Sequence, residues 1–212
     1  MRLFLVRHGL TDWNTANRFQ GKKDIPLNPE GVRQAGLAAG ALEKAGLDAV
    51  WSSPLSRAFE TASAIGRACC LNVRKHAGLA EIDHGGWEGL KAPDVETRWP
   101  GMLDVWRSEP GKVKMPEGES LTDVLGRSLN AVSDISEAYG RSAVAVVTHD
   151  AVLKVLLCHW LGMDISAGFW RFQLANASIS IVDLDEKGAR TPLIGDACHL
   201  GDPFERPEQK GL

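Results

Sequence analysis

Short apolar runs alternate along this chain with longer segments in which apolar residues recur at helical spacing. The continuous apolar runs at 3–6, 49–51 and 143–147 are typical of strands buried on both faces. A short strand at 72–74 and a late strand of alternating character at 178–184 complete this set. The helical pattern occupies four segments, at 29–44, 55–69, 121–139 and 151–161.

The order of these elements predicts the fold class. Asn28 is a good N-cap before Pro29, and Gly46 and Gly162 follow helical segments as stop signals. Strands that alternate with helices favour a three-layer α/β/α sandwich with a mostly parallel central sheet. No linker-like run interrupts the chain, so we expect one domain over 1–212.

The segment at about 81–118 departs from this alternation. It is rich in glycine, proline and tryptophan, including Gly85, Pro93, Trp99 and Trp106. We expect an excursion of short helices and loops over the edge of the sheet. Long insertions of this kind often form a lid or a substrate wall.

Composition narrows the classes of partner. The 212 residues are 44% hydrophobic and carry a formal net charge of −3, which is typical of a protein with an ordinary core and gives no sign of nucleic-acid binding. No apolar run approaches a membrane span, and we expect no membrane partner. The N-terminus enters a strand at once, and the cysteines lack a CxxC spacing, so we expect reduced thiols and a cytoplasmic location.

Two of the predicted strands end in a histidine. Arg7 and His8 follow the first strand, and His149 follows the run at 143–147. Arg57 lies one turn into the helix that follows the strand at 49–51. Because parallel strands deliver their carboxyl ends to one edge, these four groups are expected to converge there. Two guanidiniums and two imidazoles form a pocket suited to a tetrahedral dianion.

This pocket predicts covalent phosphoryl transfer. Neighbouring cations lower the pKa of a histidine and keep its lone pair available for attack on phosphorus. A leaving alkoxide also needs an acid. Glu81, where the excursion begins, is the candidate, and Asp83 and Glu88 are nearby alternatives.

Three blocks of the sequence resemble the histidine phosphatase superfamily, also called the phosphoglycerate-mutase-like family. The segment 5–14, with Arg7 and His8 at its centre, is similar to the family signature. The segments 52–58 and 147–150 are similar to the other two blocks, in the right order. Together they cover nearly the whole chain.

The resemblance implies a role for each matched residue. It implies His8 as the phosphorylated nucleophile and Glu81 as the proton donor and then the base for water. It implies phosphate binding by Arg7, Arg57 and His149, and contact with phosphate or the pocket by Asn14, Gln20 and Gly21. It implies no metal and no other cofactor, and it implies a possible homodimer.

The segment 81–89 indicates which branch of the family the chain resembles. Cofactor-dependent mutases are usually longer and carry an Arg-His-Tyr-Gly stretch after the acid, which this chain lacks. The segment is instead similar to metal-independent phosphoserine phosphatases and α-ribazole phosphatases, with further similarity at 118–121, 176–178 and 198–201. In that group the histidine after the acid and the C-terminal tail help to hold the substrate, which implies His84 and His199 as substrate contacts.

Two positions depart from the family pattern. Leu10 stands where Glu or Gln is common, and we expect little effect because the position lies outside the phosphate shell. Asp150 follows His149 where Gly is frequent. Its carboxylate either raises the pKa of His149 and repels an anionic substrate, or points away and caps the following helix; the second is favoured.

The sequence therefore predicts a phosphomonoesterase that hydrolyses a small phosphorylated metabolite, with phosphoserine favoured. The alternatives are a cofactor-dependent phosphoglycerate mutase, an α-ribazole phosphatase and a non-catalytic phospho-ligand binder. All share the phosphoryl end of the ligand, so the leaving group stays open at this point.

Overall fold

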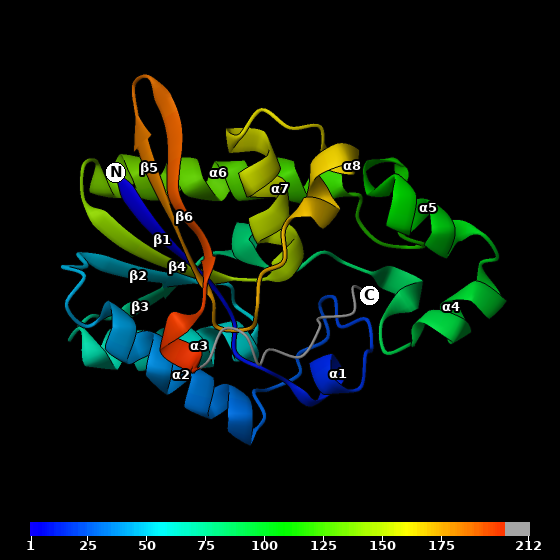
Figure 1. The fold of residues 1–212 in the computed structure, drawn as a ribbon, viewed down its shortest axis with the longest axis horizontal. Helices are drawn as coiled ribbons and strands as arrows, with labels where there is room; N and C mark the ends of the chain where they lie inside the picture. Colours follow the sequence, from blue (N-terminus) through cyan, green and yellow to red (C-terminus); the bar gives the residue numbers. More distant parts are fainter. Residues whose placement is uncertain (202–212) are drawn as a thin grey trace.

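A six-stranded sheet forms the centre of the computed structural model, which describes residues 1–201 (Figure 1). The strand order is β3-β2-β4-β1-β5-β6. The strands β3, β2, β4 and β1 pair in parallel. Strand β5 pairs antiparallel with β1 on one side and with β6 on the other. The strands span Arg2–Arg7 (β1), Ala49–Ser52 (β2), Val73–Lys75 (β3), Ala143–Thr148 (β4), Ile179–Asp185 (β5) and Gly188–Asp196 (β6).

Helices cover both faces of this sheet. Figure 1 shows α6 and α7 on one face and α2 and α3 on the other. The side chains of β1 alternate accordingly: Leu3 and Leu5 join the core under α6 and α7, and Phe4 and Val6 join the core over α2 and α3. The predicted three-layer sandwich is confirmed. The four helices span Pro29–Leu42 (α2), Ser56–Ala68 (α3), Leu121–Tyr139 (α6) and Asp150–Trp160 (α7).

The predicted excursion is also present. It contains α4 (Ala92–Arg98), α5 (Met102–Ser108) and short 3₁₀ turns at Gly85–Trp87 and Pro110–Lys112. Figure 1 shows α4 and α5 at the right, on the side toward which β1 runs. The buried rings of Trp87 and Trp106 lie 6.3 Å apart between centroids, so both tryptophans serve packing inside this layer.

Short elements and boundaries differ from the sequence prediction. The helix from Pro29 ends at Leu42, two residues before the predicted end. The four-residue helices α1 (Asp12–Thr15) and α8 (Ile165–Gly168) were not predicted, because one turn is too short to show a period.

Strand β6 is the largest element that the pattern missed. It forms an antiparallel hairpin with β5 at the edge of the sheet and contains Pro192. Most of its side chains are exposed or half-buried, with Leu193 and Ile194 among the exposed ones. An edge strand with one solvated face and a proline lacks the apolar alternation that predicts a strand.

Within residues 1–201, no single helix is long and apolar enough to cross a membrane. One sharply bent pair, 150–160 with 165–171, passes the same test by length and composition alone.

Candidate active site

His8 lies directly after β1, with its backbone N–H bonded to the carbonyl of Thr148 at 3.0 Å. The residue is 2% exposed, and its Nδ1 lies 2.7 Å from the carbonyl oxygen of Gly9. A carbonyl oxygen can only accept a hydrogen bond, so Nδ1 carries the proton. In a neutral ring, this bond leaves the lone pair on Nε2.

His149 reaches the same place from β4. The register of β1 and β4 sets Arg7 opposite Thr148, so the residues that follow the two strands are neighbours. The His8 and His149 ring centroids are 5.0 Å apart. The Nε2 of His149 lies 2.7 Å from the hydroxyl of Ser53, a residue to which the sequence assigned no separate role.

Both histidines are held neutral. Burial, together with the charges of Arg57 and Arg7, lowers the pKa of His8 well below 6.5. Burial and the charge of Arg57 lower the pKa of His149 in the same direction. Cations beside a buried imidazole oppose a further positive charge, so neither ring is protonated at pH 7.

The two arginines are anchored to backbone carbonyls. Arg57 lies in the first turn of α3 and donates to the carbonyls of Gly21 and Lys23 at 2.8 and 2.9 Å. Arg7 donates through Nη1 to the carbonyl of Leu174. Burial lowers the pKa of Arg57 to about 10, which leaves it charged at pH 7.

Three buried nitrogens on the residues around His8 have no hydrogen-bond partner in the described protein. They are the Nε atoms of Arg7 and Arg57 and the Nδ1 of His149. Buried N–H donors are rarely left unpaired, because burial removes their bonds to water. The Nε–H groups of Arg7 and Arg57 are donors, and Nδ1 of His149 is one when the Ser53 hydroxyl donates to Nε2 of that ring. Such donors in one cationic pocket fit the oxygens of a bound anion.

Glu81 is the buried acid of the neighbourhood. The residue is 8% exposed, and its Oε1 accepts from the backbone N–H of Ile82 at 2.9 Å. Burial raises the pKa of Glu81, although the charge of Arg57 opposes the rise. The two alternative acids are engaged elsewhere: Asp83 contacts Lys22 at 3.4 Å, and Glu88 accepts from the backbone N–H of Lys22 at 2.6 Å.

Asn14 and Gln20 both accept hydrogen bonds from Thr11. The Oδ1 of Asn14 completes a capping box at the start of α1, and the Oε1 of Gln20 accepts from the Thr11 hydroxyl at 2.9 Å. Gly21 has a positive φ of 56°, and a Cβ there would lie 2.2 Å from Glu88. The glycine lets this loop present its carbonyl to Arg57.

His84 lies in an aromatic setting. Its ring centroid is 5.1 Å from that of Phe19 and 5.9 Å from that of Trp106. Burial lowers its pKa to about 4, and Arg57 is close enough to add to the effect. Its buried Nδ1 has no protein partner among the described residues.

His199 lies in a 3₁₀ turn at Cys198–Leu200 and donates through Nε2 to the carbonyl of Ala177 at 3.0 Å. The backbone N–H of Ala177 in turn bonds to the carbonyl of His8 at 3.1 Å. His199 therefore supports the segment behind the nucleophile candidate. Its predicted contact with substrate stays a prediction.

Asp150 corrects one expectation. It is the first residue of α7, and its carboxylate does not cap that helix; it binds Lys154 at 2.7 Å and contacts Arg7 at 3.4 Å. Burial would raise the pKa of Asp150, but Lys154 and Arg7 hold it below its usual value. The carboxylate therefore stays charged beside Arg7. Leu10 contributes its backbone N–H to Gln34.

Asn176 and Arg127 were not assigned as site residues from the sequence. The amide of Asn176 donates to the carbonyls of His8 and Gly9 at 3.1 and 3.4 Å. Arg127 donates to carbonyls of the segment that carries Glu81. Asn176 lies in the segment 176–178 that resembles the phosphoserine phosphatases and could have been found from it, whereas Arg127 is one polar residue in an amphipathic helix.

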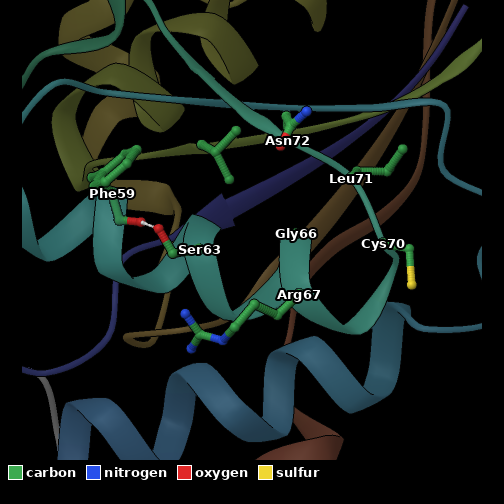
Figure 2. Close-up of a pocket in the computed structure, with 8 residues that line it drawn as sticks. Phe59, Ser63, Gly66, Arg67, Cys70, Leu71 and Asn72 are labelled. Atoms are coloured by element: carbon green, nitrogen blue, oxygen red, sulfur yellow. Dashed lines mark hydrogen bonds between the residues drawn. The ribbon is translucent and has the colours of Figure 1, made fainter.

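Two other features, metal-ligating side chains within residues 1–201 and the hollow in Figure 2, give no alternative to this site. Residues 1–201 contain no group of three or more His, Cys, Asp or Glu side chains arranged to hold a metal. A hollow of about 470 Å³ lies beside α3, and none of the site residues lines it. The hydroxyl of Ser63 in it bonds back to the carbonyl of Phe59. The lining residues are Phe59, Ser63, Gly66, Arg67, Cys70, Leu71, Asn72 and Val73 (Figure 2).

An open, mostly parallel sheet that ends in two neutral imidazoles and two guanidiniums defines an enzyme of the phosphoryl-transfer class. Comparison with known proteins then specifies the family. The model of the histidine phosphatase superfamily (branch 1) matches residues 3–197. The chain belongs to this superfamily. It is an enzyme of the superfamily's phosphatase and mutase group and a hydrolase of the histidine phosphatase family.

Three similar proteins illustrate the range of the match. Phosphoserine phosphatase 1 of Hydrogenobacter thermophilus is 36% identical over 202 residues, which cover 95% of each chain. The structure of Bacillus stearothermophilus YhfR has a TM-score of 0.90 and 30% identity, and covers 94% of this chain and 99% of its own. The phosphoserine complex of an Entamoeba histolytica phosphoserine phosphatase mutant has a TM-score of 0.81 and 28% identity, and covers 94% of this chain and 98% of its own.

Proposed function

We propose that this protein hydrolyses a small phosphomonoester through a phosphohistidine on His8, and that phosphoserine is the substrate. In the first step the Nε2 lone pair of His8 attacks phosphorus. The P–O bond to the leaving group breaks, and Glu81 gives its proton to the leaving oxygen. In the second step Glu81 takes a proton from water, the water oxygen attacks phosphorus, the P–N bond breaks and inorganic phosphate leaves.

The observation that carries this proposal is the tautomer of His8. The Gly9 carbonyl fixes the proton on Nδ1, so Nε2 is the nucleophilic atom. The lowered pKa keeps the ring neutral. A nucleophile that is neutral and correctly oriented before the substrate arrives needs no separate base for the first step.

The remaining groups fit the charges that develop on the phosphoryl oxygens. The unpaired Nε–H groups of Arg7 and Arg57 can bind equatorial oxygens as the P–O bond lengthens, and so can Nδ1 of His149 in the tautomer that protonates it. The raised pKa of Glu81 favours the protonated carboxyl that a leaving alkoxide requires.

Support for phosphoserine comes from the relatives. A phosphoserine phosphatase aligns along 95% of this chain, and a solved homologue holds phosphoserine. His84 is close enough to the pocket for its pKa to respond to Arg57, and its imidazole can donate to a carboxylate or accept from an ammonium. Those are the two polar groups that phosphoserine presents beyond its phosphate.

The test combines trapping with a substrate panel. The enzyme is mixed with radiolabelled phosphoserine and quenched in alkali; we expect an acid-labile adduct that maps to His8 and is missing from His8→Ala. Turnover of phosphoserine is expected to exceed that of α-ribazole phosphate, sugar phosphates and 3-phosphoglycerate. Full activity of His8→Ala would overturn the mechanism. Rapid formation of 2-phosphoglycerate from 3-phosphoglycerate with a bisphosphate primer would show a mutase instead.

A further inference from the structure

Arg127 binds the backbone of the segment that carries Glu81. From the second turn of α6, its guanidinium donates to three carbonyls: Gly78 through Nη1 at 2.9 Å, Ala80 through Nη1 at 2.5 Å, and Glu81 through Nη2 at 2.9 Å. Three carbonyls from four consecutive residues thus converge on one side chain. A planar group with several fixed N–H bonds can hold such an arrangement, and an ammonium cannot.

Glu119 completes the arrangement from the other side. It accepts from Nε and Nη2 of Arg127 through its two carboxylate oxygens, each at 2.9 Å. The same carboxylate accepts from the backbone N–H of Asp83, and the Glu119 backbone N–H donates to the Asp83 carbonyl, both at 2.9 Å. Backbone on both sides of Glu81 is therefore bound by one ion pair.

This ion pair differs from an ordinary surface pair. The Arg127 and Glu119 side chains are 20% and 19% exposed, and Arg127 joins α6 to a segment whose only regular structure is the 3₁₀ turn Ala77–Leu79. The pair Arg2–Asp183, of which only Arg2 is exposed, has the same bidentate geometry, but both residues lie on paired strands. A surface pair such as Arg2–Asp183 contributes little to stability by itself. Arg127 differs because its guanidinium also fixes the backbone that leads to Glu81.

We propose that Arg127 and Glu119 are positioning residues for the acid–base step: they hold the 78–83 backbone so that the Glu81 carboxyl meets the leaving oxygen and then the attacking water. The inference rests on the proposed function. The Thr148 hydroxyl assists, because it donates to the Leu79 carbonyl at 2.7 Å and ties the segment to β4 just before His149.

The first test uses Arg127→Lys, which keeps the charge but cannot reach all three carbonyls and Glu119 at once. For phosphoserine, whose alkoxide must be protonated, kcat is expected to fall about 10- to 100-fold with little change in KM. For p-nitrophenyl phosphate, whose leaving group needs no proton, the first-turnover burst is expected to change less than about threefold. Arg2→Lys is the matched control and is expected to leave both substrates unchanged.

Two further readouts separate positioning from general loss of structure. Burial raises the pKa of Glu81, so a loosened segment that admits water should shift the basic limb of kcat toward lower pH. Glu119→Gln is expected to reproduce the effect of Arg127→Lys. Because the two residues act as a unit, kcat of the double variant should fall no more than about twofold below that of either single variant. Asp183→Asn is the control for the carboxylate.

The outcomes are distinguishable. An equal loss on both substrates, or an unshifted pH limb in a folded Arg127→Lys variant, would overturn the positioning role. If Arg127→Lys does not fold, the Glu119→Gln burst and pH profile give the same decision. If the wild-type enzyme forms no phosphohistidine at all, the proposed function fails, which is a separate result.

Discussion

The two halves of the candidate site are held in different ways. The phosphate half, with His8 and His149, stands directly at the ends of β1 and β4, where sheet hydrogen bonds fix the backbone. The proposed leaving-group half, with Glu81 and His84, belongs to loops and short turns that side chains such as Arg127 hold in place.

This difference indicates which half can vary. The position of a strand end follows from the register of a buried sheet, and a one-residue slip would expose the core. A loop held by side chains can change with a few substitutions while the sheet stays intact. We therefore expect variants of the phosphate half to affect every substrate alike, and variants of the other half to depend on the leaving group.

The largest effect is expected from Glu81→Gln, which tests whether the two halves of the site act separately. The Gln side chain keeps an oxygen that can accept from the Ile82 N–H. Loss of the proton should lower kcat for phosphoserine about 10²- to 10⁴-fold. With p-nitrophenyl phosphate the enzyme should still release one equivalent of nitrophenol rapidly and then stall as phosphohistidine, because water lacks its base. Stopped-flow absorbance measures the burst, and the exposed Glu60→Gln serves as the control. Loss of the burst would contradict the assigned role.

Arg57→Ala tests the phosphate half. Loss of a donor to the transferring oxygens should lower kcat/KM about 10²- to 10³-fold. The loss should be similar for phosphoserine and for p-nitrophenyl phosphate, since both share the phosphoryl group. Steady-state assays on the two esters decide this, with the exposed Arg67→Ala on the same helix as the control. A strong dependence on the leaving group would break the proposed division of the site.

His84 makes the stability of the leaving-group half depend on pH. Its folded pKa of about 4 lies below the ordinary 6.5, so the unfolded chain binds the proton first as pH falls. Stability is therefore lost below pH 6.5, and between pH 7 and pH 5 His84 alone should lower the free energy of unfolding by about 2 kcal/mol. Urea unfolding of wild type and His84→Gln at both pH values tests this. The variant should lose less stability than wild type, and an equal loss would contradict the assignment.

The smallest effect is expected for Asn176→Ala. The amide bonds to the carbonyls of His8 and Gly9, and a net hydrogen bond contributes about 1 kcal/mol. kcat should fall less than about tenfold on every substrate, because the sheet still holds His8 in place. Assays beside the exposed Asn130→Ala measure the difference. A selective loss on phosphoserine would assign Asn176 to the leaving-group half instead.

Much of the phosphate half could be predicted from the sequence. Apolar runs that stop at Arg7-His8 and at His149 identify buried parallel strands and the groups at their ends, because such strands admit few polar residues. The fold class followed from the same alternation. The edge strand β6 could not be predicted, since its solvated residues and Pro192 carry no period.

The contacts that orient these groups could not be read from the sequence. Ser53 lies 96 positions from His149 in the chain, and Arg127 lies 46 positions from Glu81, yet each pair is joined by a hydrogen bond. Asp150 shows the same limit: the local pattern favoured a helix cap, but the carboxylate lies between Arg7 and Lys154.

The sequence by itself determined the class of fold, the family and the cationic histidine pocket at the sheet edge. Only the tertiary structure decided which nitrogen of His8 is the nucleophilic candidate, which acid is buried, and how the segment around Glu81 is held. Strand ends follow from local periodicity and the burial of apolar side chains. Proton positions, pKa values and loop geometry depend on contacts between residues far apart in the chain, which no local pattern encodes.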